Sequence, residues 1–379
     1  MKKRVMLGAV AVVIALMMIA LFVFGGMAQD PQGFTEDDLD RPEVTTIVRN
    51  ESLPGPLSGT EYPAHLTTGI SLTPMYEEYG GIVELLIGNN GENDVYVRSY
   101  SVIWDGGNAS YSVNCSKLVA SGDALGMGVL YIAGPGTNGT VGFQVRMNVW
   151  TSSNDGTMWC DKGDVVVGSF EAEVLPEEAL QERDVETNPV GYYNKVNERV
   201  DFEIVAGLAD IVLNNAPGDL SVLQIIEAYE LVRSTITYAE DEDNHWQSAS
   251  ETISLGTGDC EDQAILLASL LTALGGDCRV NLISGHAFTT VYVGNNTTDM
   301  LNVEQNTQDY YGNGVPVHWM QDDLGFWLVV DTVGMPYAGG YPAASVPVGG
   351  DGGENWNFED GDWVRTIDVT GETIEGLLF

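Results

Sequence analysis

The sequence predicts an α+β fold in two parts, an all-β domain followed by a domain of helices and strands, behind an apolar N-terminal segment. Between residues 61 and 176, short runs rich in β-branched and aromatic residues alternate with turn signals such as Asn89-Asn90-Gly91. Beyond residue 190, apolar residues recur at helical spacing and strand-like segments follow them. A chain of 379 residues is long enough for two such domains.

The first 28 residues have the pattern of a membrane anchor or an export signal. Lys2, Lys3 and Arg4 precede an uncharged apolar run over residues 5–28. As a helix this run measures about 35 Å, which is enough to span a bilayer. Small residues near its end also suit a cleaved signal peptide. We expect either a single-pass anchor in the cell membrane or a secreted protein, with the C-terminal part outside the cytoplasm in both cases.

Composition agrees with export and excludes some partners. The formal net charge is −40, from 55 acidic and 15 basic residues, so the surface repels nucleic acid. This acidity fits either a solvated surface in a salty or extracellular setting or cation binding. We favour the first because no calcium-loop spacing is present, and we expect no metal and no cofactor. Sequons for N-glycosylation begin at Asn50, Asn108, Asn114, Asn138, Asn295 and Asn296.

Residues 29–60 are acidic and contain several prolines, which predicts a linker. The 61–176 domain then holds strand-like segments at 82–87, 95–102, 141–147 and 165–174. Their spacing favours an immunoglobulin-like sandwich. No set of residues in this domain has the sequence spacing of a catalytic site, so a spacer or binding role is expected.

The 190–345 domain begins with two predicted helices, over 195–213 and 220–238, the second capped by Asp219 or Ser221. The apolar positions of the first helix are expected to face a core: Val196, Val200, Ile204, Leu208 and Ile211. A third helix follows over 260–274. Strands are predicted at 278–283, 286–293 and 326–331, with an irregular insertion at 294–325. An acidic, glycine-rich tail, 346–379, is expected to add edge strands or to stay partly loose.

The four cysteines divide into two groups. Cys115 and Cys160 lie together in the N-terminal half, and in an exported protein they are expected to form a disulfide. Cys260 and Cys278 are separated by the predicted 260–274 helix, about 20 Å long. That length far exceeds the roughly 7 Å limit on the Cα separation of a disulfide. Cys260 is therefore expected to be a free thiol, and Cys278 a buried core residue.

Cys260 is the candidate nucleophile. It lies in Gly258-Asp259-Cys260-Glu261-Asp262 at the predicted start of a helix, where the helix dipole favours the thiolate. The helix leads about 22 Å away from the thiol, and the extended segment 278–285 returns about 25 Å, so His286 comes back to the level of Cys260. The next returning strand brings Asp331 beside His286. The order Cys, His, Asp suits thiol acyl transfer.

These residues carry a family resemblance. The segment 258–264, followed by an apolar helix and Leu274-Gly275, resembles the cysteine motif of the transglutaminase-like superfamily. The segments 285–288 and 326–332 resemble its histidine and aspartate motifs, and 236–238 with 246–249 is similar to its microbial branch. The resemblance covers about residues 190–345. It implies a papain-like α+β core, with Cys260 as nucleophile, His286 as acid/base and Asp331 as the partner that orients the histidine.

Some roles stay open in the sequence. The oxyanion of the reaction is expected to be stabilised by Trp246 or Gln247 beside the Cys260 backbone N–H. Glu261 and Asp262, in the first helical turn, are expected to act as capping residues. Further acids between the histidine and aspartate motifs compete with Asp331 for the third role: Asp299, Glu304, Asp309, Asp322 and Asp323.

The resulting hypothesis is an extracytoplasmic enzyme that acts on peptide or glutamine carboxamide bonds through an acyl-enzyme. Water as acceptor makes it a peptidase or amidase, and an amine makes it a protein cross-linking transferase. The expected partner is a protein or peptide substrate, together with a membrane through residues 5–28. The alternative is a catalytically silent module for binding or adhesion at the cell surface.

Overall fold

The computed structural model describes residues 45–49, 65–107, 110–113, 115–153, 158–240, 245–311, 314–350 and 352–374. The segment predicted to anchor the chain in a membrane, 5–28, lies outside this part of the chain. Among the described residues, no helix combines the length and the apolar character needed to cross a membrane. Residues 45–49, within the predicted linker, form a strand.

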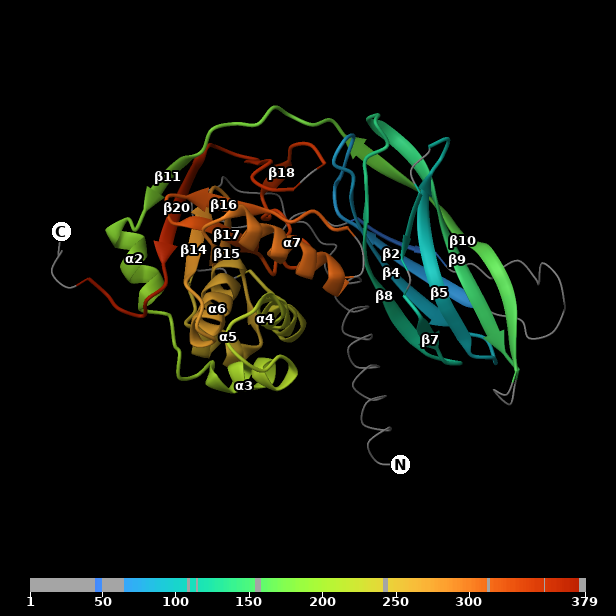
Figure 1. Cartoon of the computed structure of the whole chain (residues 1–379), viewed down its shortest axis with the longest axis horizontal. Helices are drawn as coiled ribbons and strands as arrows, with labels where there is room; N and C mark the ends of the chain where they lie inside the picture. Colours follow the sequence, from blue (N-terminus) through green and yellow to red (C-terminus); the bar gives the residue numbers. More distant parts are fainter. Residues whose placement is uncertain are drawn as a thin grey trace.

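The N-terminal half consists of two β-sheets. The first has the order β1-β2-β4-β8, and the second has the order β3-β10-β9-β5-β6 with β7 beside β5. Figure 1 shows these sheets together on the right, with the labelled helices to their left. The strands are β1 (Thr45–Arg49), β2 (Leu66–Leu72), β3 (Met75–Tyr76), β4 (Gly81–Asn89), β5 (Val95–Trp104), β6 (Ser110–Val113), β7 (Lys117–Val119), β8 (Ala124–Ile132), β9 (Gly139–Ser152) and β10 (Trp159–Leu175).

Period-two burial is the reason that these segments form strands facing a common core. In β5, Val95, Val97 and Val102 are at most 1% exposed, while Arg98 points outward to solvent. Residues of both sheets meet in one hydrophobic cluster, for example Val83 of β4 and Val145 of β9. Alternating side chains therefore stabilise the pairing of two sheets, each with one buried face.

The C-terminal half is a six-stranded sheet with helices packed on it, in the order β11-β20-β14-β15-β17-β16. Its strands are β11 (Asp184–Thr187), β14 (Cys278–Ile283), β15 (His286–Gly294), β16 (Trp319–Asp322), β17 (Gly325–Val330) and β20 (Trp363–Asp368). Two small pairs lie beside it, β12 (Thr237–Tyr238) with β13 (Thr257–Gly258) and β18 (Ser345–Pro347) with β19 (Trp356–Phe358). The helices are α2 (Val190–Asn197), α3 (Ala206–Asn215), α4 (Val222–Thr235), α5 (Ala249–Leu255), α6 (Cys260–Ala273) and α7 (Thr297–Tyr311).

Helix α6 is the centre of this half. A capping box starts it, because the Asp259 side chain accepts from the Asp262 backbone N–H and the Asp262 side chain accepts from the Asp259 backbone N–H. Its residues from Cys260 to Leu271 are all buried, so the helix is surrounded by protein. Each fully buried leucine contributes about 1.5–3 kcal/mol of hydrophobic stabilisation. The cysteine at its start is held on a rigid, central element.

The predicted helix over 195–213 is wrong, since α2 ends at Asn197 and α3 begins at Ala206. The Asp201 carboxylate accepts from the backbone N–H groups of Glu203 and Ile204, and this local turn competes with helix continuation. Ile204 and Ile211, expected in the core, are both 47% exposed. The second predicted helix agrees with α4, whose N-cap is Ser221.

The 294–325 insertion is not irregular, because it contains α7 and β16. The Asn296 side chain caps α7 by accepting from the Asp299 N–H, and Met300, Val303 and Thr307 form its buried stripe. Because this stripe is short and interrupted by polar residues, the helical period was hard to see in the sequence. The tail also differs from expectation, since β20 is an interior strand between β11 and β14.

The predicted Cys115–Cys160 disulfide is a further correction, since both residues are free thiols. Cys160 lies in β10, whereas the Cys115 thiol contacts the Val97 carbonyl of β5 at 3.5 Å. Strand β9 stands between β10 and β5. Neighbouring strands are about 4.8 Å apart, so this separation exceeds the reach of a disulfide.

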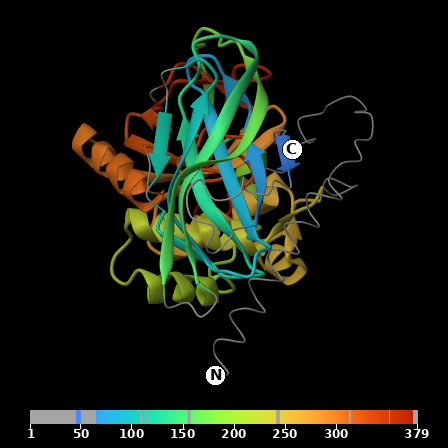
Figure 2. The same ribbon diagram turned by 90° about the vertical axis from the view of Figure 1, so that its right-hand side faces the viewer.

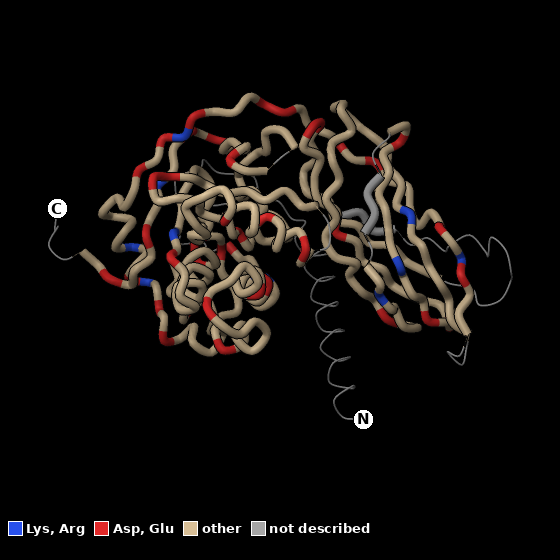
Figure 3. Tube along the Cα trace, in the orientation of Figure 1, with Lys and Arg blue, Asp and Glu red and all other residues tan. Residues whose placement is uncertain are grey.

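The two halves lie side by side, and the view in Figure 2 shows the β half in front of the α+β half. A third hydrophobic cluster contains residues of both, among them Tyr79 of the β half and Phe288 of the α+β half. Acidic residues are spread over the surface of both halves (Figure 3).

Candidate active site

The three predicted catalytic residues come from three elements that meet in the middle of the α+β half. Cys260 is the first residue of α6, His286 is the first residue of β15, and Asp331 directly follows β17. Strands β15 and β17 are antiparallel neighbours, which places Asp331 beside His286. Cys260 is 1% exposed, His286 is 0% exposed and Asp331 is 5% exposed.

His286 and Asp331 form a buried pair. The distance between His286 Nε2 and Asp331 Oδ2 is 2.6 Å. The other ring nitrogen of His286, Nδ1, is buried without a hydrogen-bond partner. Because one nitrogen is held by the carboxylate, the other is available to exchange a proton with a neighbouring group.

Backbone amides complete the environment of Asp331. Val333 N–H donates to Oδ1 at 3.0 Å and Ala343 N–H donates to Oδ2 at 2.8 Å. Burial alone raises the pKa of the Asp331 carboxyl, but the charge of His286 and these hydrogen bonds outweigh it and lower the pKa below its ordinary value. Asp331 is therefore held as a carboxylate that faces the histidine.

Cys260 lies beside the histidine segment, because the Ala287 backbone hydrogen-bonds the sulfur. The thiol donates to the Glu261 carboxylate at 3.6 Å. Burial first, and then the charges of Glu261 and Asp259, raise the pKa of Cys260 well above its ordinary value. The helix dipole was expected to favour the thiolate, but burial and two neighbouring acids outweigh it, and the resting group is a thiol.

Glu261 and Asp262 were both expected to cap the helix, and only Asp262 belongs to the capping box. Glu261 is 0% exposed, and its Oε1 has no hydrogen-bond partner. Burial, as the largest cause, raises the pKa of Glu261 to about 7. Only a capping role was expected of Glu261 from the sequence, although its position directly after Cys260 was a signal that it lies beside the thiol.

Trp246 and Gln247 lie at the N-terminal end of α6. The Gln247 backbone N–H donates to Asp262 Oδ1 at 2.7 Å, which ties this segment to the start of the cysteine helix. Trp246 is 3% exposed, and both its indole N–H and the Gln247 Oε1 are buried without partners. Lys195 Nζ lies 3.8 Å from the centre of the Trp246 ring and covers one of its faces.

Two residues that the sequence analysis missed connect α6 to the Asp331 segment. Gln263 donates through Nε2 to the Gly258 carbonyl at 3.0 Å, and its Oε1 accepts from the Thr332 hydroxyl at 2.9 Å. Both occur within the quoted cysteine and aspartate motifs, so position in the motif was the only available signal.

Four of the five competing acids are engaged elsewhere, and Asp323 is exposed. Asp322 accepts from Arg279 at 2.6 Å, and Asp299 accepts from the Asn296 side chain at 2.6 Å. Glu304 and Asp309 accept from glutamine side chains on their own helix. Asp331 is the carboxylate that meets His286.

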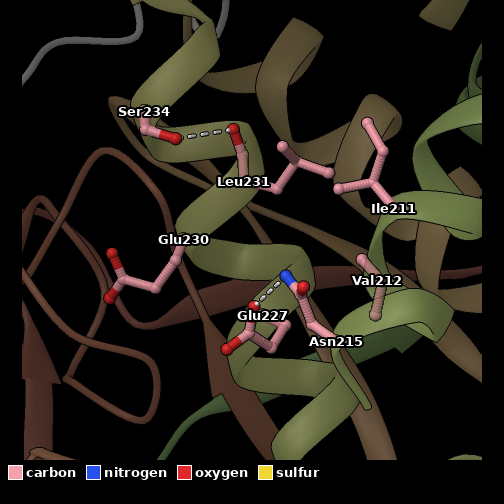
Figure 4. A pocket seen from close by; sticks show the side chains of 7 residues that line it. All are labelled: Ile211, Val212, Asn215, Glu227, Glu230, Leu231 and Ser234. Atoms are coloured by element: carbon pink, nitrogen blue, oxygen red, sulfur yellow. Dashed lines mark hydrogen bonds between the residues drawn. The ribbon is translucent and has the colours of Figure 1, made fainter. Parts of the chain in front are cut away.

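No group of three or more His, Cys, Asp and Glu side chains within the described part of the chain is placed to hold a metal ion. A surface pocket of about 200 Å³ lies between α3 and α4 (Figure 4). It is lined by Ile211, Val212, Asn215, Glu227, Glu230, Leu231 and Ser234, and by none of the predicted site residues.

Comparison with known proteins identifies a family for part of the α+β half. Residues 208–321 match the family model described as the transglutaminase-like superfamily. No curated protein matches the chain. A solved structure described as "a putative protease from Parabacteroides distasonis ATCC 8503" is 8% identical, with a TM-score of 0.23. The match covers 60% of this chain and 62% of that protein, less than two thirds of its length.

The matched residues include the cysteine helix, the Trp246 segment and the strand that starts at His286, and they end before Asp331. The segment from Cys260 to His286 thus lies inside the matched residues. Asp331, which pairs with His286, lies beyond their end and directly follows β17. Residues 208–321 of this chain are a transglutaminase-like superfamily domain.

Proposed function

We propose that this protein is a thiol enzyme that transfers acyl groups from peptide or glutamine carboxamide bonds, with Cys260 as nucleophile. The observation that carries the proposal is the buried His286–Asp331 pair, 2.6 Å apart, whose free Nδ1 belongs to the strand that contacts the Cys260 sulfur through Ala287. A general base next to a thiol and oriented by a carboxylate is the arrangement that activates such a nucleophile.

The reaction begins from the thiol. The Cys260 proton passes to His286 Nδ1 as the sulfur attacks the substrate carbonyl carbon, and negative charge moves to the carbonyl oxygen. The oxyanion accepts hydrogen bonds from the Cys260 backbone N–H and from Trp246 Nε1–H or the Gln247 side-chain amide. His286 then returns the proton to the leaving nitrogen, the C–N bond breaks and a thioester forms. Asp331 stabilises the imidazolium at both stages.

The acceptor decides the product. Water attacking the thioester releases an acid and makes the enzyme a peptidase or amidase, whereas an amine forms a new amide and makes it a transferase. We favour hydrolysis, because an opening that admits a peptide carbonyl to the sulfur also admits water, and water is the default acceptor wherever a site does not exclude it. Since Cys260 is 1% exposed, the segments that cover it must move before a peptide carbonyl reaches the sulfur.

A glutamine peptide incubated with a fluorescent amine tests this function. Amine incorporation identifies a transferase, and release of ammonia or peptide fragments alone identifies a hydrolase. Cys260→Ala is expected to abolish either product, while Cys278→Ala, which removes another buried thiol, is the matched control that keeps turnover. Turnover that survives Cys260→Ala would sink the proposal.

The second candidate is a catalytically silent binding or adhesion module, favoured by the burial and raised pKa of Cys260. It predicts no turnover and equally slow labelling of Cys260 and Cys278 by iodoacetamide at neutral pH. The enzyme instead predicts faster labelling of Cys260, which peptide mapping by mass spectrometry measures.

We further propose that the protein acts outside the cytoplasm. The apolar run over 5–28 supports an anchor or a signal, and the two-sheet arrangement of the 61–176 domain is compatible with an immunoglobulin-like sandwich. We propose the domain bounds as 1–28, 29–60, 61–176, 190–345 and 346–379. Mass measurement of the mature N-terminus in membrane and soluble fractions separates a retained anchor from a cleaved signal.

A further inference from the structure

A loop of the β half enters the core of the α+β half. It connects β3 to β4 and carries Tyr79, which is 0% exposed. Tyr79, Tyr76 and Ile82 belong to the same hydrophobic cluster as Phe288 and Tyr341 of the α+β half. The loop lies where the two halves meet in Figure 1. A spacer domain has no need of such a shared core, since domains joined by a linker usually keep separate cores.

The Tyr79 ring packs against two rings of the α+β half. Its centroid lies 5.6 Å from Tyr341 and 5.9 Å from His318, and the Tyr341 and His318 rings are themselves 5.5 Å apart. Aromatic pairs at these separations add stabilisation beyond the buried area. Tyr79 therefore closes a three-ring cluster that spans the two halves.

Tyr341 belongs to residues 331–344, here called the Asp331 strap. Two residues after Tyr341, the Ala343 N–H donates to Asp331 Oδ2, the same oxygen that meets His286. The strap passes very close to this carboxylate, because a Cβ added to Gly334 would lie 2.6 Å from Oδ2. Any displacement of Tyr341 would therefore be transmitted to the atom that orients the histidine.

The loop is also fastened to the chain that follows the strap. One Glu177 oxygen accepts from the backbone N–H groups of Glu78 and Tyr79, and the other accepts from Gly349 N–H at 2.7 Å. The Tyr131 hydroxyl of β8 donates to the Tyr79 carbonyl at 2.5 Å. The Tyr79 backbone is thus held by Glu177, which follows β10, and by Tyr131 of β8, and these contacts fix the position of its ring.

We infer that Tyr79 is a positioning residue for the Asp331 carboxylate, so that the β half is a required part of the catalytic unit. This inference rests on the proposed function of Cys260, His286 and Asp331. Tyr79 acts on the reaction by holding Tyr341, and through it the strap and the Ala343 N–H, against Asp331.

Substitution of Tyr79 tests the inference in the full chain. Tyr79→Ala opens a cavity behind Tyr341, and we expect kcat to fall by roughly 10²-fold with little change in KM, because catalysis depends steeply on alignment. Tyr79→Phe keeps the ring that packs on Tyr341 and His318 and removes only the hydroxyl that interacts with Tyr337, so it should retain the parent kcat. Tyr100→Ala is the matched control, since it empties the same volume in the separate core of the β half.

A second readout does not depend on turnover. The proton on His286 Nε2, hydrogen bonded to a carboxylate, gives a downfield ¹H NMR resonance that can be assigned by its loss in His286→Gln. Tyr79→Ala should shift or broaden this resonance, whereas Tyr79→Phe and Tyr100→Ala should leave it in place. If the parent protein shows no turnover, the proposed function fails while this measurement still decides the positioning role.

Glu177→Ala serves if Tyr79→Ala does not fold, because it frees the loop without opening a cavity, and it should move the resonance in the same direction. The inference is overturned if Tyr79→Ala keeps the parent kcat and resonance. It is also overturned if Tyr100→Ala changes both as much as Tyr79→Ala does, or if folded Glu177→Ala leaves the resonance unmoved.

Discussion

At the scale of single residues, the candidate site combines a protonated cysteine thiol with a histidine that a carboxylate already orients. Burial and the neighbouring acids Glu261 and Asp259 disfavour the negatively charged thiolate of Cys260, so its pKa is raised and the thiol keeps its proton. His286 meets Asp331 through Nε2 and leaves Nδ1 without a partner. In the proposed reaction, proton transfer to His286 during attack activates the Cys260 sulfur, and no thiolate has to form at the helix end beforehand.

Asp331→Asn is expected to lower kcat by about 10⁴-fold, the loss seen when the orienting aspartate of a catalytic triad becomes an amide. The amide keeps the shape but loses the charge that stabilises the imidazolium. Steady-state turnover of the glutamine peptide measures the effect. Asp322→Asn is the control, since Asp322 pairs with Arg279 and not with His286. Equal losses in both variants would contradict the assignment of Asp331.

At the scale of elements, each proposed catalytic residue lies at the start or just past the end of a regular element. Cys260 opens α6, His286 opens β15 and Asp331 follows β17, so rigid backbone fixes their separation while each side chain stays at an element end. The strap is less regular and is held by side chains: the Tyr229 hydroxyl donates to the Met335 carbonyl at 2.6 Å. The Tyr311 hydroxyl accepts from Ala338 N–H at 3.0 Å. Geometry at Asp331 therefore depends on both kinds of support.

Gly334→Ala tests the strap. Its new Cβ would lie 2.6 Å from Asp331 Oδ2 and 2.9 Å from the Ala343 nitrogen, so the strap must shift away from the carboxylate. Activity is expected to fall by roughly 10²-fold. Gly314→Ala, at a position with nothing within 4 Å of the added Cβ, should leave turnover unchanged. An active Gly334→Ala enzyme would mean that the strap does not control the site.

At the scale of the whole molecule, the two halves are joined through buried aromatic residues and a few polar links. The Arg233 guanidinium of α4 lies 3.2 Å from the Glu84 carboxylate of β4. His318 sits in the three-ring cluster with Tyr79 and Tyr341, where burial lowers its pKa to about 3. The interface therefore contains a histidine that stays neutral in the folded protein at mildly acidic pH.

This histidine predicts a pH dependence of stability. Between about pH 6.5 and 3 the unfolded state binds a proton at His318 that the folded state does not, so the free energy of unfolding falls as pH falls through that window. His318→Gln should flatten the slope by up to about 1.4 kcal/mol per pH unit. Urea unfolding from pH 4 to 6.5 measures it. His245→Gln, at a histidine whose side chain is 59% exposed, is the control; equal slopes in parent and His318→Gln would contradict the prediction.

Local patterns in the sequence predict the helices α4 and α6 and the strands that bring the candidate site together. Periodic apolar residues and a Ser221 cap predict α4, and the acids around Cys260 mark the start of α6. The lengths of α6 and β14 place His286 at the level of the cysteine, and the returning strand places Asp331 beside it. These predictions succeed because each depends on short-range chain geometry.

Tertiary contacts decide the remainder. The interior place of β20, the free thiols of Cys115 and Cys160, and the thiol form of Cys260 all depend on distant neighbours or on burial. The sequence alone therefore determines which residues form the candidate site and the order of the elements that carry them. Only the tertiary structure decides the protonation and the burial of the candidate site and the packing of Tyr79 against Tyr341, because desolvation and packing arise between segments far apart in the chain.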